Sequence, residues 1–201
     1  MQNFTVALAS ASPRRKALLE QIGLAVVRVG TGIDESRKHE EPVIDYVARL
    51  AREKAEAGQQ DASAAALPVI AGDTVVAIGE TRFDKPVDYD DAVTTLRTLA
   101  GRTHEVHSGV AVRFANAPAE VRVVTSYVTF RALDDAEIDA YWASGEPHDK
   151  AGAYAIQGLG ATFVERLEGS FSAVMGLPIF EVARLLHGGG VDVLDASRWA
   201  A

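Results

Sequence analysis

The sequence predicts a single mixed α/β unit over residues 1–201, with a twisted mixed sheet and flanking helices. Three observations predict this fold class. Of the 201 residues, 48% are hydrophobic, enough for a sizeable core without covalent cross-links. Strand-like and helix-like patterns follow one another along the chain, with no repeat, low-complexity tract or linker between them. Residues 106–114 and 121–130 alternate like paired antiparallel strands. The alternative is two lobes, residues 1–101 and 102–201, with the last helix packing back on the first lobe.

The chain opens with a strand, a short turn and a helix. Residues 4–9 alternate large and small apolar side chains, as a strand that is at least half buried does. Ser12 suits the N-cap of the helix that follows, Pro13 suits its first turn, and Gly23 suits the position after its end. This segment therefore predicts a β-turn-α unit.

The remaining elements follow from the same patterns. Further strands are expected at residues 25–29, 67–78, 106–114 and 121–130. Further helices are expected to begin at Pro42, Asp88, Asp134 or Asp135, and Pro178. The glycine-rich segment over residues 149–169 is expected to be mostly extended.

Charge and composition exclude several classes of protein. The chain has 20 Lys and Arg against 28 Asp and Glu, a net charge of −8, which repels nucleic-acid polymers. With no Cys, disulfides, thiolate metal sites and Cys nucleophiles are excluded, so a metal would need oxygen or imidazole ligands. The N-terminus lacks a basic and apolar leader, and no apolar run approaches the ~20 residues of a membrane span. We therefore expect a soluble protein of the reducing cytoplasm that does not contact a membrane.

The turn between the first strand and first helix is a candidate phosphate site. It reads Ser10-Ala11-Ser12-Pro13-Arg14-Arg15. Free backbone N–H groups at a helix N-terminus favour anions, and Arg14 and Arg15 add guanidinium donors. Cations there oppose the helix dipole, so two adjacent arginines favour anion binding over stability. The alternative is a solvated basic turn.

Polar residues inside an apolar strand mark a second candidate. Gly72-Asp73-Thr74 interrupts the run over residues 67–78. A carboxylate there must be paired, metal-bound or solvated in a cleft, because an isolated buried charge is costly. Asp73 is therefore a candidate to bind Mg²⁺, to activate water, or both. The alternative is an Asp that only caps a strand end.

Four more side chains complete the candidate set. Glu35 follows the second strand, and Lys54 projects from the edge of the predicted buried face of its helix, where its stem could simply cover apolar surface. Lys85 follows the hairpin whose first strand carries Asp73. Gln157 lies among apolar residues and glycines and offers a donor pair and an acceptor, the groups that can bind the edge of a base.

Taken together, these residues resemble the Maf family of nucleoside triphosphate pyrophosphatases. The resemblance extends from Leu8 to about Leu186. Six motifs carry it in order: Leu8-Ala9-Ser10-Ala11-Ser12-Pro13-Arg14-Arg15, Arg49-Leu50-Ala51-Arg52-Glu53-Lys54-Ala55, Gly72-Asp73-Thr74, Asp84-Lys85-Pro86, Lys150-Ala151-Gly152-Ala153-Tyr154 with Ile156-Gln157-Gly158, and Gly176-Leu177-Pro178. Ala11 and Ala155 depart from the pattern, because close relatives often have Gly at both positions. Either Ala fits the same backbone unless φ is positive.

The resemblance implies a fold with a cleft between two lobes, and hydrolysis of a nucleoside triphosphate to the monophosphate and pyrophosphate. Arg14, Thr74 and Gln157 match the branch that acts on dTTP and UTP. On this hypothesis, Ser10, Arg14, Arg15, Lys54 and Lys85 hold the triphosphate, and Thr74 and Gln157 bind uracil or thymine. Glu35 and Asp73 hold Mg²⁺ or Mn²⁺, and Asp73 orients or deprotonates the attacking water.

Two other functions fit the same residues. One is a house-cleaning pyrophosphatase that acts on modified nucleotides, with dTTP and UTP as incidental substrates. The other is a nucleotide-binding regulator of septum formation and cell division. A pure binder has no need of a water-activating carboxylate, so an intact set of Glu35, Lys54, Asp73 and Lys85 favours catalysis. The sequence leaves the oligomeric state open, with a homodimer through residues 121–130 as one alternative.

Overall fold

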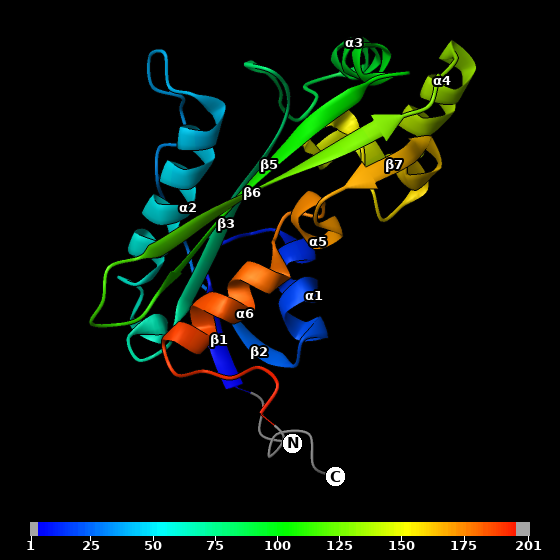
Figure 1. The fold of residues 1–201 in the computed structure, drawn as a ribbon. Helices are drawn as coiled ribbons and strands as arrows, with labels where there is room; N and C mark the ends of the chain where they lie inside the picture. The colour runs from blue at the N-terminus through cyan, green and yellow to red at the C-terminus, as the bar shows by residue number, and fades with distance from the viewer. Residues whose placement is uncertain (1–3, 196–201) are drawn as a thin grey trace. The chain divides into compact units, whose positions relative to one another are not determined.

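The computed structural model describes residues 4–195, which form a mixed α/β fold on a seven-stranded sheet (Figure 1). The predicted fold class is confirmed. The strands are β1 (Phe4–Leu8), β2 (Leu24–Arg28), β3 (Val69–Ile78), β4 (Thr81–Phe83), β5 (Thr103–Arg113), β6 (Glu120–Phe130) and β7 (Val164–Glu168). The α-helices are α1 (Pro13–Gln21), α2 (Val43–Gly58), α3 (Tyr89–Leu99), α4 (Asp135–Ala143), α5 (Phe171–Val174) and α6 (Ile179–Gly188). Short 3-10 helices are η1 (Ala62–Ala64), η2 (Glu146–Asp149), η3 (Ala151–Ala153) and η4 (Leu159–Phe163).

The sheet is mixed, with strand order β2-β1-β3-β5-β6-β7 and with β4 paired to β3. β1 runs parallel to both β2 and β3, whereas β4 is antiparallel to β3 and β7 is antiparallel to β6. Side-chain hydrogen bonds join Thr103 to Thr129 and His107 to Thr125. From Thr103 to His107 the residue number on β5 rises by four, while that of the partner on β6 falls by four. The two strands are therefore antiparallel, as predicted.

Contacts divide the chain into two compact units. The first contains the described residues up to Asp73, Ser108–Val123 and those from Gly176 on, and the second contains Thr74–His107 and Val124–Met175. β3, β5 and β6 each contribute to both units, so the division falls within strands and at several points in the chain. The lobes expected at residues 1–101 and 102–201, with the last helix packing back, stay a prediction.

The core of the first unit is built from small side chains. Alanines of α2 pack with alanines and valines of β1, β3 and β5 in one apolar cluster. Glycine allows the closest approach: a Cβ on Gly109 of β5 would lie 2.4 Å from the Val47 carbonyl oxygen of α2. Figure 1 shows α2 on one side of these strands and α1 and α6 on the other. Side chains alternate between the two faces of a strand, and helices cover both faces here, so the side chains on both faces are buried.

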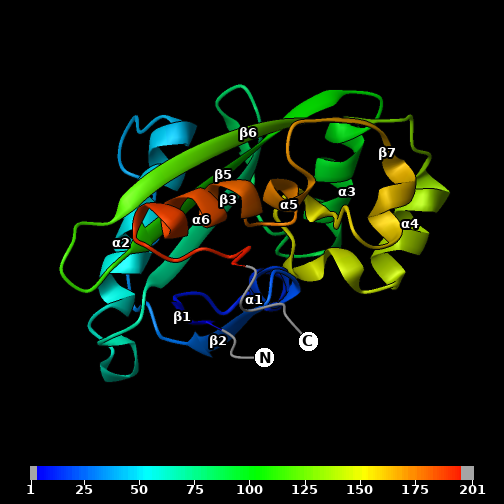
Figure 2. The same ribbon diagram turned by 60° about the horizontal axis from the view of Figure 1, so that its bottom comes forward.

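The second unit has an aromatic core. His104, Phe130, Tyr154 and Phe163 meet in edge-to-face pairs with ring centroids 4.7–5.9 Å apart, a favourable geometry for aromatic rings. α3 contacts both α4 and η3 in this unit (Figure 2). The helix expected to begin at Asp134 or Asp135 is α4, and a capping box forms at its start, where Asp134 and Glu137 each accept from the other's backbone N–H.

One expectation about local structure is wrong. The segment over residues 149–169 is not mostly extended, because η3, η4 and the end of η2 precede β7. Gly152 and Ala153 both have positive φ, of 70° and 55°, which turns the chain twice in succession. The strand expected over residues 67–78 does form, because β3 runs unbroken through Gly72-Asp73-Thr74.

Burial of His104 should make the protein acid-sensitive. The ring is 1% exposed and bonds Tyr154 Oη through Nε2, and burial lowers its pKa from 6.5 to about 4. Between these values the unfolded chain binds the proton and the folded chain does not, so stability is complete above pH 6.5 and falls toward pH 4. We expect His104 to account for a loss of about 3 kcal/mol in the free energy of unfolding.

Urea unfolding at pH 4.5, 5.5 and 7 measures this loss. His104→Gln should flatten the pH dependence, whereas His39→Gln, at an exposed histidine, should leave it unchanged. An equal pH slope in wild type and His104→Gln would show that other groups cause the acid sensitivity.

Candidate active site

The turn before α1 is organised by side-chain hydrogen bonds. The Ser12 hydroxyl accepts from the Arg15 backbone N–H and caps the helix, with Pro13 in the first turn. Ser10 Oγ accepts from the Ser12 backbone N–H at 3.2 Å and from Arg15 Nη1 at 3.0 Å. Arg15 Nε donates to the Gly176 carbonyl at 2.8 Å, so one guanidinium links this turn to the segment before α6.

The electrostatics of this turn favour an anion. Burial lowers the pKa of Arg15, and the neighbouring Arg14 cation lowers it further, while the Asp73 and Glu35 carboxylates oppose this shift. Ser10 is buried, and both arginines are partly buried. Two adjacent cations at a helix N-terminus, with limited access to water, are stabilised when an anion binds.

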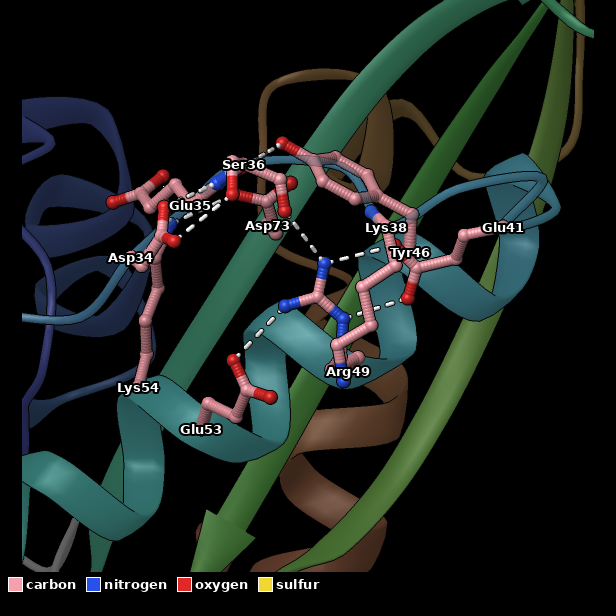
Figure 3. A network of polar contacts seen from close by, with 10 residues as sticks. All are labelled: Asp34, Glu35, Ser36, Lys38, Glu41, Tyr46, Arg49, Glu53, Lys54 and Asp73. Carbon is pink, nitrogen blue, oxygen red and sulfur yellow. Dashed lines mark hydrogen bonds and ion pairs between the residues drawn. The ribbon is translucent and has the colours of Figure 1, made fainter.

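Lys54 joins two carboxylates that are far apart in the sequence. Its Nζ lies 2.7 Å from Glu35 Oε2 and 2.8 Å from Asp73 Oδ1 (Figure 3). The exposed fractions of the side chains are 7% for Lys54, 13% for Asp73 and 53% for Glu35. Lys54 is therefore more than a lysine stem that covers apolar surface. The three side chains form one charged cluster that is open to solvent at Glu35.

Gly72 brings β3 close to its neighbours just before Asp73. A Cβ at this position would lie 2.9 Å from the Gly109 carbonyl oxygen and 3.6 Å from Arg15 Nε. Any larger residue would push β3 away from β5. Close packing between β3 and β5 thus requires glycine at position 72. The next residue, Asp73, lies close enough to Arg15 to affect its pKa.

The other three predicted site residues belong to the second unit. Thr74 follows Asp73 on β3 and is partly buried, whereas Lys85 and Gln157 are exposed. The backbone N–H of Gly152 donates to the Asp84 carbonyl at 3.2 Å, which joins the segment of Lys85 to the segment that leads to Gln157. The roles of these three residues stay predictions.

Sequence reasoning missed the residue that organises the turn around Gln157. Glu146 accepts hydrogen bonds from Tyr141 Oη and from the backbone N–H groups of Leu159 and Gly160, at 2.8–2.9 Å. Tyr141 Oη in turn accepts from the Ala155 N–H at 3.0 Å. Both sides of Gln157 are thus held by one carboxylate and one phenol. In the sequence Glu146 looks like any surface acid beside a proline, and nothing local marks it.

Comparison of the sequence with known proteins identifies the family of this chain. Residues 5–188 match the family described as Maf-like protein. The chain belongs to the Maf family. It is 50% identical over 179 residues to a protein of Escherichia coli O6:K15:H31 named dTTP/UTP pyrophosphatase, covering 89% of this chain and 90% of that protein. It is 48% identical over 189 residues to a Chromobacterium violaceum protein of the same name, covering 92% and 95%.

Similarity to solved structures is lower. A nucleoside-triphosphatase, dITP/XTP pyrophosphatase from Mycobacterium abscessus aligns with a TM-score of 0.41 and 16% identity, over 63% of this chain and 74% of that chain. The assignment to the Maf family rests on the sequence matches.

The two departures from the Maf pattern are accommodated. Neither Ala11 nor Ala155 is among the described residues with positive φ, so alanine is unstrained at both positions. The non-glycine residues with positive φ in the described part of the chain are Glu40 and Ala153. From residue 4 to residue 195, no helix of this Maf chain is both long and apolar enough to cross a membrane.

The metal-ligand chemistry of the site is limited to oxygen. Over the described part of the chain, no group of three or more His, Asp or Glu side chains is arranged to hold a metal. Glu35 and Asp73 nevertheless direct one oxygen each to a single cation, the Lys54 ammonium. Mg²⁺ is commonly held by one or two carboxylates together with water and substrate phosphates. The pair therefore fits a divalent ion that arrives with a triphosphate.

Proposed function

We propose that this protein hydrolyses dTTP and UTP to the nucleoside monophosphate and pyrophosphate, with Mg²⁺ or Mn²⁺ as cofactor. The observation that carries the proposal is the Glu35, Lys54 and Asp73 cluster, which brings two carboxylates and an ammonium together in the same unit as the arginines of α1. The proteins that are 48–50% identical over about nine-tenths of the chain support the substrates, since they are named dTTP/UTP pyrophosphatases.

The triphosphate is assigned to the turn before α1. Its negative charge is compensated by Arg14 and Arg15, and Ser10 and the backbone N–H groups of the helix N-terminus add donors. Because Arg15 is already held by Ser10 and Gly176, it needs little reordering when the anion binds.

Asp73 is assigned to the attacking water. Its Oδ1 accepts from Lys54, which leaves Oδ2 as the atom that takes the proton from water. The water oxygen forms a bond to the α-phosphorus, the bond from that phosphorus to the bridging oxygen breaks, and pyrophosphate leaves with the electron pair. Lys54 and Arg15 stabilise the negative charge that develops on the leaving group.

The proposed cofactor would be held by Glu35 and Asp73. When bound, Mg²⁺ or Mn²⁺ supplies positive charge that neutralises the phosphate oxygens of the substrate. The same carboxylates hold the Lys54 ammonium at 2.7 and 2.8 Å, which supports their affinity for a cation.

Base selection is assigned to the second unit. Thr74 and Gln157 would accept from N3–H and donate to a carbonyl of uracil or thymine, and Lys85 would compensate phosphate charge. Glu146 supports this role by ordering the backbone on both sides of Gln157. A hydrogen-bonding site of this kind rejects bases that lack the matching groups. The substrates are intracellular metabolites, which supports a cytoplasmic location; a homodimer stays a prediction.

The test is the release of pyrophosphate from a panel of triphosphates with and without Mg²⁺. We expect kcat/KM to be highest for dTTP and UTP, at least 100-fold lower for purine triphosphates, and lost with EDTA. Higher kcat/KM for base-modified triphosphates than for dTTP and UTP would favour the house-cleaning function. Tight nucleotide binding without turnover would favour a regulator.

A further inference from the structure

Glu35, which we assign to the reaction centre, lies on an irregular segment of the chain. It lies in the segment between β2 and α2, where residues 29–42 form no regular helix or strand, and its side chain is about half exposed. Yet its carboxylate is held 2.7 Å from Lys54. Something other than secondary structure must therefore fix the backbone on which it sits.

An ion pair joins this segment to α2 at Arg49, five residues before Lys54. Arg49 of α2 binds Glu41 with both ends of its guanidinium, Nε to Oε1 at 2.6 Å and Nη2 to Oε2 at 2.8 Å (Figure 3). The two side chains are only 12% and 10% exposed. A bidentate pair fixes direction as well as distance, and lysine cannot reproduce it.

Further contacts of the same helix hold the backbone beside Glu35. Arg49 Nη2 also donates to the Ser36 carbonyl at 3.0 Å, and Tyr46 Oη donates to the Glu35 carbonyl at 2.8 Å. Asp34 accepts from both the N–H and the hydroxyl of Ser36 at 2.9 Å. The carbonyl groups of two successive residues, Glu35 and Ser36, are thus tied to α2, the helix that also carries Lys54.

From these contacts we infer that Arg49 and Glu41 are positioning residues that hold Glu35 against Lys54 and Asp73. The inference rests on the proposed function, because it holds that the Arg49–Glu41 pair positions Glu35 for the hydrolysis of the triphosphate. One rigid helix then sets both partners of the Glu35–Lys54 contact, and the cost of ordering the segment is met before the substrate binds.

The pair keeps its charges under assay conditions. Hydrogen bonds from Arg49 hold the pKa of Glu41 at about 2, and those to Glu41 raise the pKa of Arg49. Glu41 therefore stays ionised at neutral pH, and the ion pair with Arg49 persists. Mutation, and not a change of pH, is needed to break the pair.

A double-mutant cycle tests the inference. Arg49→Met should lower kcat for dTTP by about 10- to 100-fold, the range seen when the partner that orients a metal ligand is removed. Arg49→Lys should recover only part of the loss. If Arg49 acts through Glu35, then Arg49→Met should cost less than 3-fold in a protein that already carries Glu35→Gln. Additive losses, or a wild-type kcat in Arg49→Met, would overturn the inference. Arg52→Met, at an exposed arginine of the same helix, is the matched control.

Hydrogen exchange separates this inference from the proposed function. In Arg49→Met and in Glu41→Gln, amides of residues 34–41 should exchange at least 10-fold faster than in wild type, without substrate, while peptides of α1 and β3 exchange as before. Unchanged exchange in residues 34–41 refutes the positioning role whether or not the protein hydrolyses dTTP. Faster exchange everywhere would mean that the pair supports the whole fold, which also contradicts it.

Discussion

Asp73→Asn should lower kcat for dTTP and UTP by about 10³-fold, with a much smaller change in KM. Asparagine has nearly the same shape but cannot take a proton from water, and a positioned general base contributes 10²- to 10⁴-fold. The substitution also removes one of the two carboxylates that face Lys54 at 2.7–2.8 Å. Steady-state release of pyrophosphate at saturating Mg²⁺ measures the effect.

The control for Asp73→Asn is Asp45→Asn, a carboxylate on the exposed side of the first turn of α2. It should keep kcat within 2-fold. Thermal unfolding of both variants shows whether the fold is retained. Turnover by Asp73→Asn within 10-fold of wild type, in a folded protein, would remove Asp73 from the central role.

Lys54→Met should be costly for both rate and stability. The Lys54 side chain is 7% exposed and its ammonium lies between Glu35 and Asp73, so its loss leaves two like charges facing one another with Asp73 largely buried. Removing one partner of a buried ion pair lowers the free energy of unfolding by about 3 kcal/mol at the lower end of the usual range. We expect a loss near this lower end, because Glu35 is half exposed to solvent. We expect kcat to fall by about 10²-fold as well, because a cation near the developing charge is lost.

Urea unfolding and pyrophosphate release measure the two effects of Lys54→Met. Arg52→Met removes a positive charge from the exposed surface of the same helix and should change neither quantity appreciably. Equal stability of Lys54→Met and wild type would show that solvent already screens the two carboxylates from each other. In that case Lys54 would not be needed to hold them together.

Much of the local structure follows from short-range chemistry that the sequence displays. Ser12, Asp88 and Asp134 each cap the helix that they were expected to begin, because capping depends only on residues two or three positions away. The antiparallel pair β5 and β6 was predicted from alternation. The turns at Gly152 and Ala153 were not, since Gly152 packs against Val76 of β3 and donates to the Asp84 carbonyl, and contacts between such distant segments leave no local pattern.

The candidate site was predictable in its residue types and not in its contacts. Asp73 was conspicuous because a carboxylate in an apolar run needs a partner, but the sequence does not say that the partner is Lys54. Glu41 and Glu146 carry no local signal, and Arg49 stood out only as part of a motif, because the importance of all three comes from hydrogen bonds between residues 5 to 14 positions apart. Contacts of this kind form only after the helices and strands have been placed.

The most direct test of the proposed reaction is the fate of the water oxygen. Wild-type protein is incubated with dTTP and Mg²⁺ in water enriched in oxygen-18, and the products are analysed by mass spectrometry. Attack at the α-phosphorus predicts one labelled oxygen in dTMP and unlabelled pyrophosphate. Label in pyrophosphate or in orthophosphate, or formation of dTDP, would contradict the mechanism proposed for this Maf protein.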